Sequence, residues 1–266
     1  MERSRSLRGE ALGQGGTSGG GTCAVDVPVE VPVNLVYATL PHAVLMATPA
    51  DFEDFAIGFS VTEGIVRHAA EIRGIVVAEV ARGVVVDVEL APDALRGHLA
   101  RRRSMSGRTG CGLCGIESLD QLPAARPVAG GPTIGWAAMR RALLGLEALQ
   151  GATRAVHAAA FCAPDGTILL VREDVGRHNA LDKLVGGCLR AGYLARDGFV
   201  VLTSRCSFEM IEKAAAFGAS TVVAISAPTS LAIGRAEALG VRLVAIARPD
   251  GAIGFTQLAI GREVVA

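Results

Sequence analysis

The first half of the chain carries short apolar runs in the pattern of β-strands. The segments VPVNLVYA and AVLMATP, on either side of Pro41-His42, predict one strand pair, and GIVVAEVARGVVVDVEL predicts a hairpin about Arg82-Gly83. Between them, residues 51–64 place apolar side chains at helical spacing, which predicts a helix capped by Asp51. A second helix is expected over residues 92–103.

The second half, from residue 133 onward, alternates helical and strand-like segments. A helix over residues 136–149 is followed by a hairpin that turns at a Pro-Asp-Gly sequence, and then by a helix over residues 177–191. The segments FVVLTS, TVVAIS and VRLVAIA predict strands separated by the helices SFEMIEKAAAFG and TSLAIGRAEALG. This order predicts a largely parallel sheet with helices on both faces.

These patterns divide the chain into three parts and place it in the α/β class. Residues 1–24 are expected to be a disordered tail, because six of the nine residues from 13 to 21 are glycine. Residues 25–132 form a smaller strand-rich α+β domain that ends in a mobile loop over residues 104–118. Residues 133–266 form the α/β domain.

Composition narrows the possible partners and compartment. The 266 residues include 26 basic and 26 acidic side chains, so a general affinity for nucleic acid or an anionic membrane surface is not expected. The N-terminal segment has no apolar core of a secretory signal, and the longest apolar runs are too short or too charged to span a membrane. We expect a cytoplasmic protein.

Six cysteines fit a reducing compartment, and two of them stand apart. Cys162 and Cys188 lie in apolar segments, where a free cysteine acts as a small hydrophobic residue. Cys111 and Cys114 form a CxxC pair in GRTGCGLCG, directly after the arginine-rich stretch RRRSMSGR.

Three chemistries fit this pair, and the residues alone leave them open. A zinc site needs further ligands at regular spacing, and the sequence has no second CxxC pair. Thiol–disulfide exchange normally places the pair at a helix start, where the surrounding glycines are unfavourable. Cationic neighbours favour the thiolate, and would equally favour a persulfide anion, which suggests transfer of a soft group. For the arginines alone, a solvated helix end is the simpler explanation.

Polar residues also collect at the ends of the predicted strands of the second half. The sequences REDVGRHN, TSRCS, SAPTS and RPDG each follow an apolar strand. Ligands of open α/β sheets bind outside the carboxyl ends of the strands, and helix N-termini bind phosphate. Any one of these hydroxyls is most simply a helix cap, but the four ends together predict a nucleotide or similar phosphate ester.

Several motifs resemble the formate dehydrogenase accessory sulfurtransferase family, the FdhD/NarQ group. They are GRTGCGLCG, EDVGRHNALDKLVG, LTSRCSFEMIEKAAAFG and SAPTSLAI, together with the segment VPVNLVYATLPHAVLMATPADFEDFAIGFSVTEGIV. The resemblance covers about residues 25–260. It implies a C-terminal three-layer α/β/α fold of the cytidine deaminase type and a homodimer. The zinc signature of the deaminases is absent from this sequence, so deamination is not implied.

The resemblance also implies an activity and a set of site residues. A family member takes persulfide sulfur from a cysteine desulfurase and transfers it to the molybdenum of the bis(molybdopterin guanine dinucleotide) cofactor, which formate dehydrogenase requires. By match to the motif, Cys111 is the expected persulfide carrier and Cys114 the second thiol. The segment expected to contact the cofactor, for which GDP is a partial mimic, comprises Ile246, Ala247, Arg248, Pro249, Asp250 and Gly251.

Two other functions compete with this one. A thiol–disulfide oxidoreductase would use the same dithiol on a generic disulfide without a nucleotide. A cofactor-binding chaperone would need only the phosphate-binding edge and could dispense with the cysteines.

Overall fold

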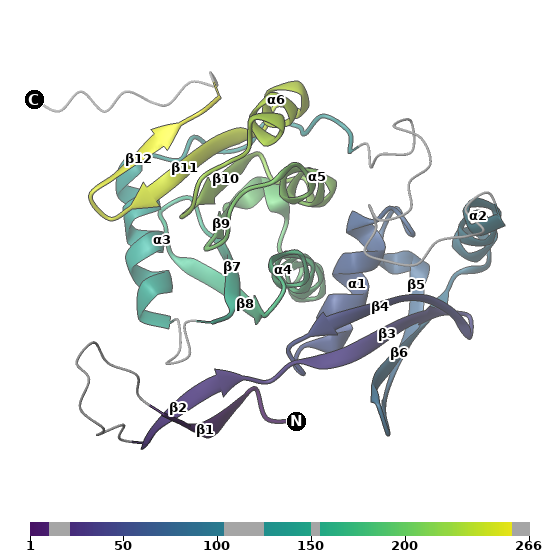
Figure 1. The fold of residues 1–266 in the computed structure, drawn as a ribbon. Helices are drawn as coiled ribbons and strands as arrows, with labels where there is room; N and C mark the ends of the chain where they lie inside the picture. The colour runs from purple at the N-terminus through teal and green to yellow at the C-terminus, as the bar shows by residue number, and fades with distance from the viewer. Residues whose placement is uncertain (11–21, 104–124, 150–154, 257–266) are drawn as a thin grey trace, which may run out of the picture.

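The computed structural model describes residues 1–10, 22–103, 125–149 and 155–256. These residues form a six-stranded sheet, a four-stranded sheet and a separate strand pair, with helices between and outside the sheets (Figure 1). The predicted α/β class is therefore confirmed.

The four-stranded sheet belongs to the first half of the chain and has the order β4-β3-β6-β5. Its strands are β3 (Val31–Tyr37), β4 (Leu40–Ala47), β5 (Ile72–Val80) and β6 (Gly83–Leu90). The β3–β4 and β5–β6 pairs are antiparallel, as the strand pair and hairpin predicted, and β3 pairs with β6 in parallel. Helix α1 (Phe52–Thr62) packs its apolar face on this sheet, and α2 (Pro92–Arg103) follows it.

The predicted cap of α1 differs from the observed one. Asp51 does occupy the N-cap position, but its φ is 55° and its carboxylate makes no capping hydrogen bond. The carboxylate instead lies 3.7 Å from the guanidinium of Arg172 and 3.6 Å from that of Arg3. Ion pairs to other parts of the chain have thus replaced the local capping bond.

The six-stranded sheet has the order β12-β11-β10-β9-β7-β8. Its strands are β7 (His157–Cys162), β8 (Ile168–Asp174), β9 (Phe199–Leu202), β10 (Thr221–Ala224), β11 (Arg242–Arg248) and β12 (Gly251–Gly254). Only the β9–β10 and β10–β11 pairs are parallel, so the prediction of a largely parallel sheet was wrong. Tight turns join β7 to β8 and β11 to β12, and such turns impose antiparallel pairing, whereas helical crossovers permit parallel pairing.

Helices cover both faces of this sheet, as predicted. Helices α4 (Arg177–Ala191), α5 (Phe208–Phe217) and α6 (Ser230–Leu239) pack on one face, and α3 (Trp136–Leu149) packs on the other. The result is a three-layer α/β/α arrangement (Figure 1). Among the helices that the structure describes, none is both long and apolar enough to cross a membrane.

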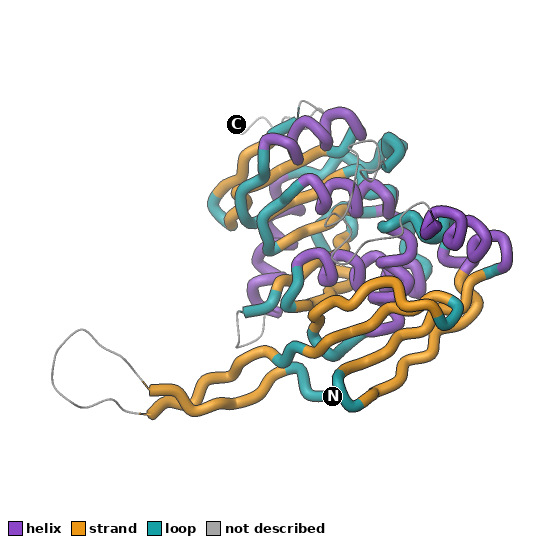
Figure 2. Tube along the Cα trace, turned by 45° about the vertical axis from the view of Figure 1, so that its right-hand side comes forward, coloured by secondary structure: helices purple, strands orange, loops and turns teal. Residues whose placement is uncertain are grey.

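The N-terminal segment differs from the predicted disordered tail. Strands β1 (Ser4–Glu10) and β2 (Thr22–Pro28) pair antiparallel over their full length. They extend away from both sheets (Figure 2). The pairing satisfies backbone groups of residues 4–10 and 22–28. The glycine-rich residues 13–21, on which the prediction of a disordered tail rests, lie outside the described part of the chain.

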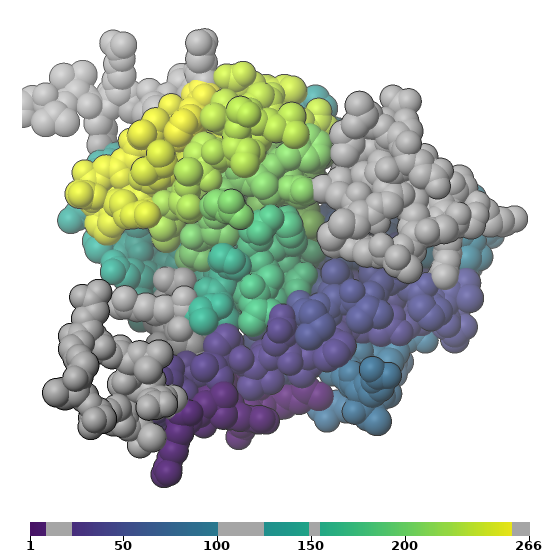
Figure 3. Space-filling model, in the orientation of Figure 1, coloured from purple at the N-terminus to yellow at the C-terminus, as the bar shows by residue number. Residues whose placement is uncertain are grey.

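The two halves of the chain meet where α1 crosses α4. At this crossing a Cβ atom on Gly58 would overlap the carbonyl oxygen of Asp182, and one on Gly186 would overlap that of Asp54. The two helix backbones are therefore in direct contact, which only glycine permits. In the space-filling view, the purple-to-blue first half lies directly against the teal-to-yellow second half (Figure 3).

A buried ion pair ties the end of β4 to the end of β8. The Nζ of Lys183 lies 2.6 Å from Asp174, and both side chains are fully buried. Lys183 also donates to the carbonyl of Thr48 (2.9 Å), and Asp174 accepts from the Thr48 backbone N–H (3.0 Å). These bonds fix the four-stranded sheet against the carboxyl end of β8.

Candidate functional site

The carboxyl ends of four strands share one edge of the six-stranded sheet. Because β7 runs antiparallel to both of its neighbours, β8 points the same way as β9, β10 and β11. The prediction that the polar sequences after these strands meet at one edge is therefore confirmed. The N-terminal residue of β7, His157, lies at the same edge and pairs with Asp174.

The segment from Ile246 to Gly251 covers the turn between β11 and β12 at this edge. The register of the pair shifts between Ala245 and Arg248, and Ile246 has a φ of 53°, which is rare for a β-branched residue. Ile246 is 42% exposed, whereas Ala247 is buried. Strained backbone of this kind concentrates at functional sites.

Hydrogen bonds hold this turn against its neighbours. The Ile246 N–H donates to the carbonyl of Ser226 (3.2 Å), and Arg248 donates to the carbonyls of Ile225 and Ala247. On the far side, the Nε of Arg140 donates to the carbonyl of Pro249 (2.9 Å). Asp250 remains exposed at the tip.

The loops that precede α5 and α6 are joined to each other. The Cys206 N–H donates to the carbonyl of Ala227 (3.2 Å), and the Thr229 N–H donates to the carbonyl of Cys206 (3.0 Å). The Thr229 hydroxyl accepts from the N–H of Ala232 (3.2 Å), so Thr229 is a helix cap. These donors are consequently occupied, and α6 offers less of a phosphate site than its sequence suggested.

The N-termini of α4 and α5 offer a better one. The Nε of Arg177 and the Nε2 of His178 are buried without a hydrogen-bond partner among the described residues. Burial lowers the pKa of His178 to about 4, and the nearby charge of Arg177 acts in the same direction. The imidazole is therefore neutral at pH 7. Buried polar atoms without partners are uncommon and call for a ligand or water.

Cationic side chains lie at the ends of three strands along this edge: Arg177 after β8, Arg205 after β9 and Arg248 at the end of β11. Burial lowers the pKa of His157, and the charges of Arg177 and Arg205 lower it further, against the opposing effect of Asp174. Within the described part of the chain, Arg177, Arg205 and Arg248 form no ion pair with a carboxylate. Together with the helix N-termini, they make this edge attractive to an anion.

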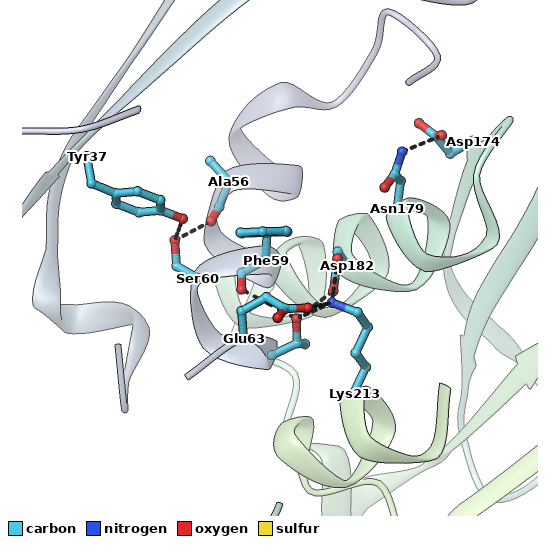
Figure 4. Close-up of polar contacts among 10 residues, drawn as sticks. Tyr37, Ala56, Phe59, Ser60, Glu63, Asp174, Asn179, Asp182 and Lys213 are labelled. Atoms are coloured by element: carbon cyan, nitrogen blue, oxygen red, sulfur yellow. Dashed lines mark hydrogen bonds and ion pairs between the residues drawn. The ribbon is translucent and has the colours of Figure 1, made fainter. Parts of the chain in front are cut away.

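Behind this edge, a polar cluster fills the junction of α1, α4 and α5 (Figure 4). The Nζ of Lys213 donates to Thr62 (3.0 Å), to Glu63 (2.6 Å) and to both carboxylate oxygens of Asp182 (3.0 and 2.9 Å). Thr62 in turn donates to Asp182 (2.6 Å). Burial raises the pKa of Asp182 to about 6, although the charge of Lys213 opposes this. One cation thus links three helices from the two halves.

The cysteines expected to carry sulfur, Cys111 and Cys114, lie in the 104–118 loop, outside the described residues. Of the described cysteines, Cys162, Cys188 and Cys206 are fully buried, and burial raises the pKa of each thiol to about 12. They are protonated and inaccessible, which agrees with a structural role.

The chain re-enters the described structure at Ala125, on the surface of α5 and α6. Its N–H donates to the carboxylate of Glu212 (2.6 Å), and its carbonyl accepts from Arg235 (3.4 Å). Arg235 also donates to Glu212. The segment that contains the CxxC pair therefore runs between the end of α2 and this contact.

Sequence reasoning missed Lys213, Asp182 and Glu212 as components of the site. Each belongs to an adjacent pair of charges inside an otherwise apolar helical segment, Asp182-Lys183 in ALDKLV and Glu212-Lys213 in MIEKAAAF. A charge at a position where the helical period expects an apolar side chain is the signal that could have found them.

Comparison with known proteins identifies the family. The model of the FdhD/NarQ family matches residues 28–259. A protein from Bordetella petrii named sulfur carrier protein FdhD is 46% identical over 245 residues, covering 90% of this chain and 88% of its own. The protein of the same name from Agrobacterium fabrum is 48% identical over 242 residues, covering 87% of both chains.

A solved structure has the same fold. It is a crystal structure from Desulfotalea psychrophila, assigned as a formate dehydrogenase accessory protein, and it aligns with a TM-score of 0.73 at 24% identity. The alignment covers 96% of this chain and 97% of the other. From the extent of the family match and the identity to these relatives, we conclude that this chain belongs to the FdhD/NarQ family.

Proposed function

We propose that this chain is a sulfur carrier that serves formate dehydrogenase. In this proposal it accepts sulfur as a persulfide on Cys111 from a cysteine desulfurase and delivers it to the molybdenum of bis(molybdopterin guanine dinucleotide). The observation that carries the proposal is the contrast between cysteines. Three described thiols are buried and protonated, whereas the CxxC pair follows a run of arginines that favours the thiolate.

The side chains at the carboxyl ends of β8, β9, β10 and β11 support the proposal that the acceptor contains a nucleotide. Arg177 and His178 present buried atoms without partners, and Arg205 and Arg248 are cations without carboxylates among the described residues. Guanidinium groups pair well with phosphate oxygens, and two helix N-termini add to the positive potential. These groups fit the phosphates of a guanine dinucleotide, and the Ile246–Arg248 backbone lies farther along the same edge, at the end of β11.

The transfer can be written with balanced bonds. The Cys111 thiolate attacks the terminal sulfur of the donor persulfide, the donor S–S bond breaks, and the donor cysteine leaves as a thiolate. For release, the Cys114 thiolate attacks Sγ of Cys111, and the terminal sulfur leaves as sulfide toward the metal. This step leaves a Cys111–Cys114 disulfide, which a cellular dithiol must reduce before the next cycle.

Persulfide trapping tests the carrier role. The protein is incubated with cysteine and a cysteine desulfurase, alkylated and digested, and the Cys111 peptide is weighed by mass spectrometry. We expect an adduct of about 32 Da, one sulfur atom, because the thiolate is the species that accepts sulfur. An oxidoreductase would instead give only the Cys111–Cys114 disulfide, and a chaperone would give neither product; either result contradicts the proposal.

Binding of GDP tests the nucleotide site. Replacing Arg177 or Arg248 by alanine is expected to weaken GDP binding by roughly tenfold, the usual effect of losing one charge-assisted hydrogen bond. Thr229→Ala serves as the control, since its hydroxyl caps α6 and is not free for phosphate. Isothermal titration calorimetry measures all three. Unchanged affinity in both arginine variants would place the nucleotide elsewhere.

A further inference from the structure

A pair of side chains from two helices holds the residue at which the CxxC segment ends. Glu212 on α5 accepts the N–H of Ala125 at 2.6 Å, and Arg235 on α6 donates to the Ala125 carbonyl at 3.4 Å. The two side chains also bond to each other. Both backbone groups of one residue are thus bound by a single ion pair, which we call the Ala125 clamp.

Forming the Ala125 clamp requires burial of a charged carboxylate, which an anchor made only of backbone hydrogen bonds would not require. The side chain of Glu212 is 3% exposed and that of Arg235 is 24% exposed. Burying a carboxylate is unfavourable unless its oxygens are bonded, and here the two bonds come from Arg235 and from the Ala125 N–H. If Ala125 moved away, the buried carboxylate of Glu212 would lose one of these two hydrogen bonds.

The clamp lies close to the anion-attracting edge. Glu212 is five residues from Ser207, the N-cap of α5, so about 8 Å of helix separates the two. From the other end, Cys114 is 11 residues from Arg103 and 11 from Ala125. A chain of that length reaches at most about 38 Å from either end. Fixing Ala125 therefore anchors one end of the segment that contains the dithiol near this edge.

We propose that Glu212 and Arg235 are positioning residues for sulfur delivery. They fix one end of the CxxC segment beside the edge at which the acceptor binds. This inference rests on the carrier function proposed above, because it assigns the clamp to one of its two steps.

The two steps depend differently on a fixed end. For loading, the donor is a separate protein that can approach the thiol from solvent, so the exact position of the segment matters little. For delivery, the acceptor site lies on the same chain, and productive geometry depends on where the segment begins and ends. A purely structural role would instead affect both steps equally, through loss of folded protein.

The experiment measures both steps in two variants. Glu212→Gln retains the shape of the side chain and removes its charge, and Arg235→Met removes the donor to the Ala125 carbonyl. We expect loading of Cys111, followed by mass spectrometry, to match wild type. Activation of apo formate dehydrogenase by the loaded protein is expected to fall by roughly tenfold, because misplacing one end of the segment reduces the fraction of productive geometries. Faster hydrogen exchange of the Ala125 amide is expected in both variants.

Arg141→Met, which breaks the exposed pair between Arg141 and Asp165, is the matched control and should leave both steps unchanged. Equal loss of loading and delivery, or delivery at the wild-type rate with a faster-exchanging Ala125 amide, overturns the inference. If wild type itself acquires no sulfur on Cys111, the carrier function fails instead. Should Arg235→Met not fold, the isosteric Glu212→Gln variant decides the question alone.

Discussion

Replacing Cys111 by alanine is expected to abolish activation of formate dehydrogenase, by a factor of roughly 100 or more, because the nucleophile that accepts sulfur is lost. The three buried cysteines cannot substitute for it. Cys162, Cys188 and Cys206 are fully buried, and burial raises their pKa values to about 12, so none presents a thiolate to a donor. The measurement is formate oxidation in cells that lack their own carrier and express each variant.

Two further variants make this result specific. Cys23 is exposed on β2, and Cys23→Ser should activate the enzyme as wild type does, since exposure alone does not make a carrier. Cys114→Ala separates the two roles of the dithiol: we expect it to retain the sulfur adduct on Cys111 and to lose most of the delivery. Full activation by Cys111→Ala would contradict the proposed function.

Local signals in the sequence were sufficient for the helices. The predicted spans Pro92–Arg103, Trp136–Leu149 and Arg177–Ala191 agree with the observed elements. Periodic apolar residues define each span, and for α4 the following Gly192, at a φ of 76°, ends the helix. The shared edge of the strands also followed from sequence, since alternating helices and strands restrict the possible connections.

Long-range pairing was not predictable in the same way. The four-residue strand β12 has no distinctive pattern, and it exists because it completes the edge of β11. Asp51 was assigned correctly as an N-cap position, but its partners, Arg3 and Arg172, are far from it in the sequence. Local propensity cannot identify such partners.

The same limit applies to the site. The polar residues after each strand indicated an anion site, and the structure leaves buried polar atoms of Arg177 and His178 without partners, whereas Thr229 is already used as a helix cap. The distinction depends on which donors are already used within the protein. The cluster around Lys213 likewise depends on three helices meeting, and each of its residues alone is an ordinary charged side chain.

Gly58→Ala is expected to destabilise the protein by about 3 kcal/mol or more, which corresponds to a loss of roughly 6–12 °C in Tm. A methyl group at this position would overlap the backbone carbonyl of Asp182, and backbone cannot move aside as a flexible side chain can. Separating α1 from α4 to admit it would also stretch the bonds from Lys213 to Thr62 and Glu63. Thermal and urea-induced unfolding measure the effect.

Gly97→Ala is the matched control, because it makes the same substitution inside helix α2, where a Cβ would meet no atom within 4 Å. There, alanine should stabilise the protein by up to about 1 kcal/mol, since glycine is a poor helix former. Opposite signs in the two variants would show that the α1–α4 crossing, rather than helix propensity, determines the cost. If Gly58→Ala were as stable as Gly97→Ala, the backbones of α1 and α4 could not be in contact. The arrangement of α1, α4 and α5 around Lys213 would then be wrong.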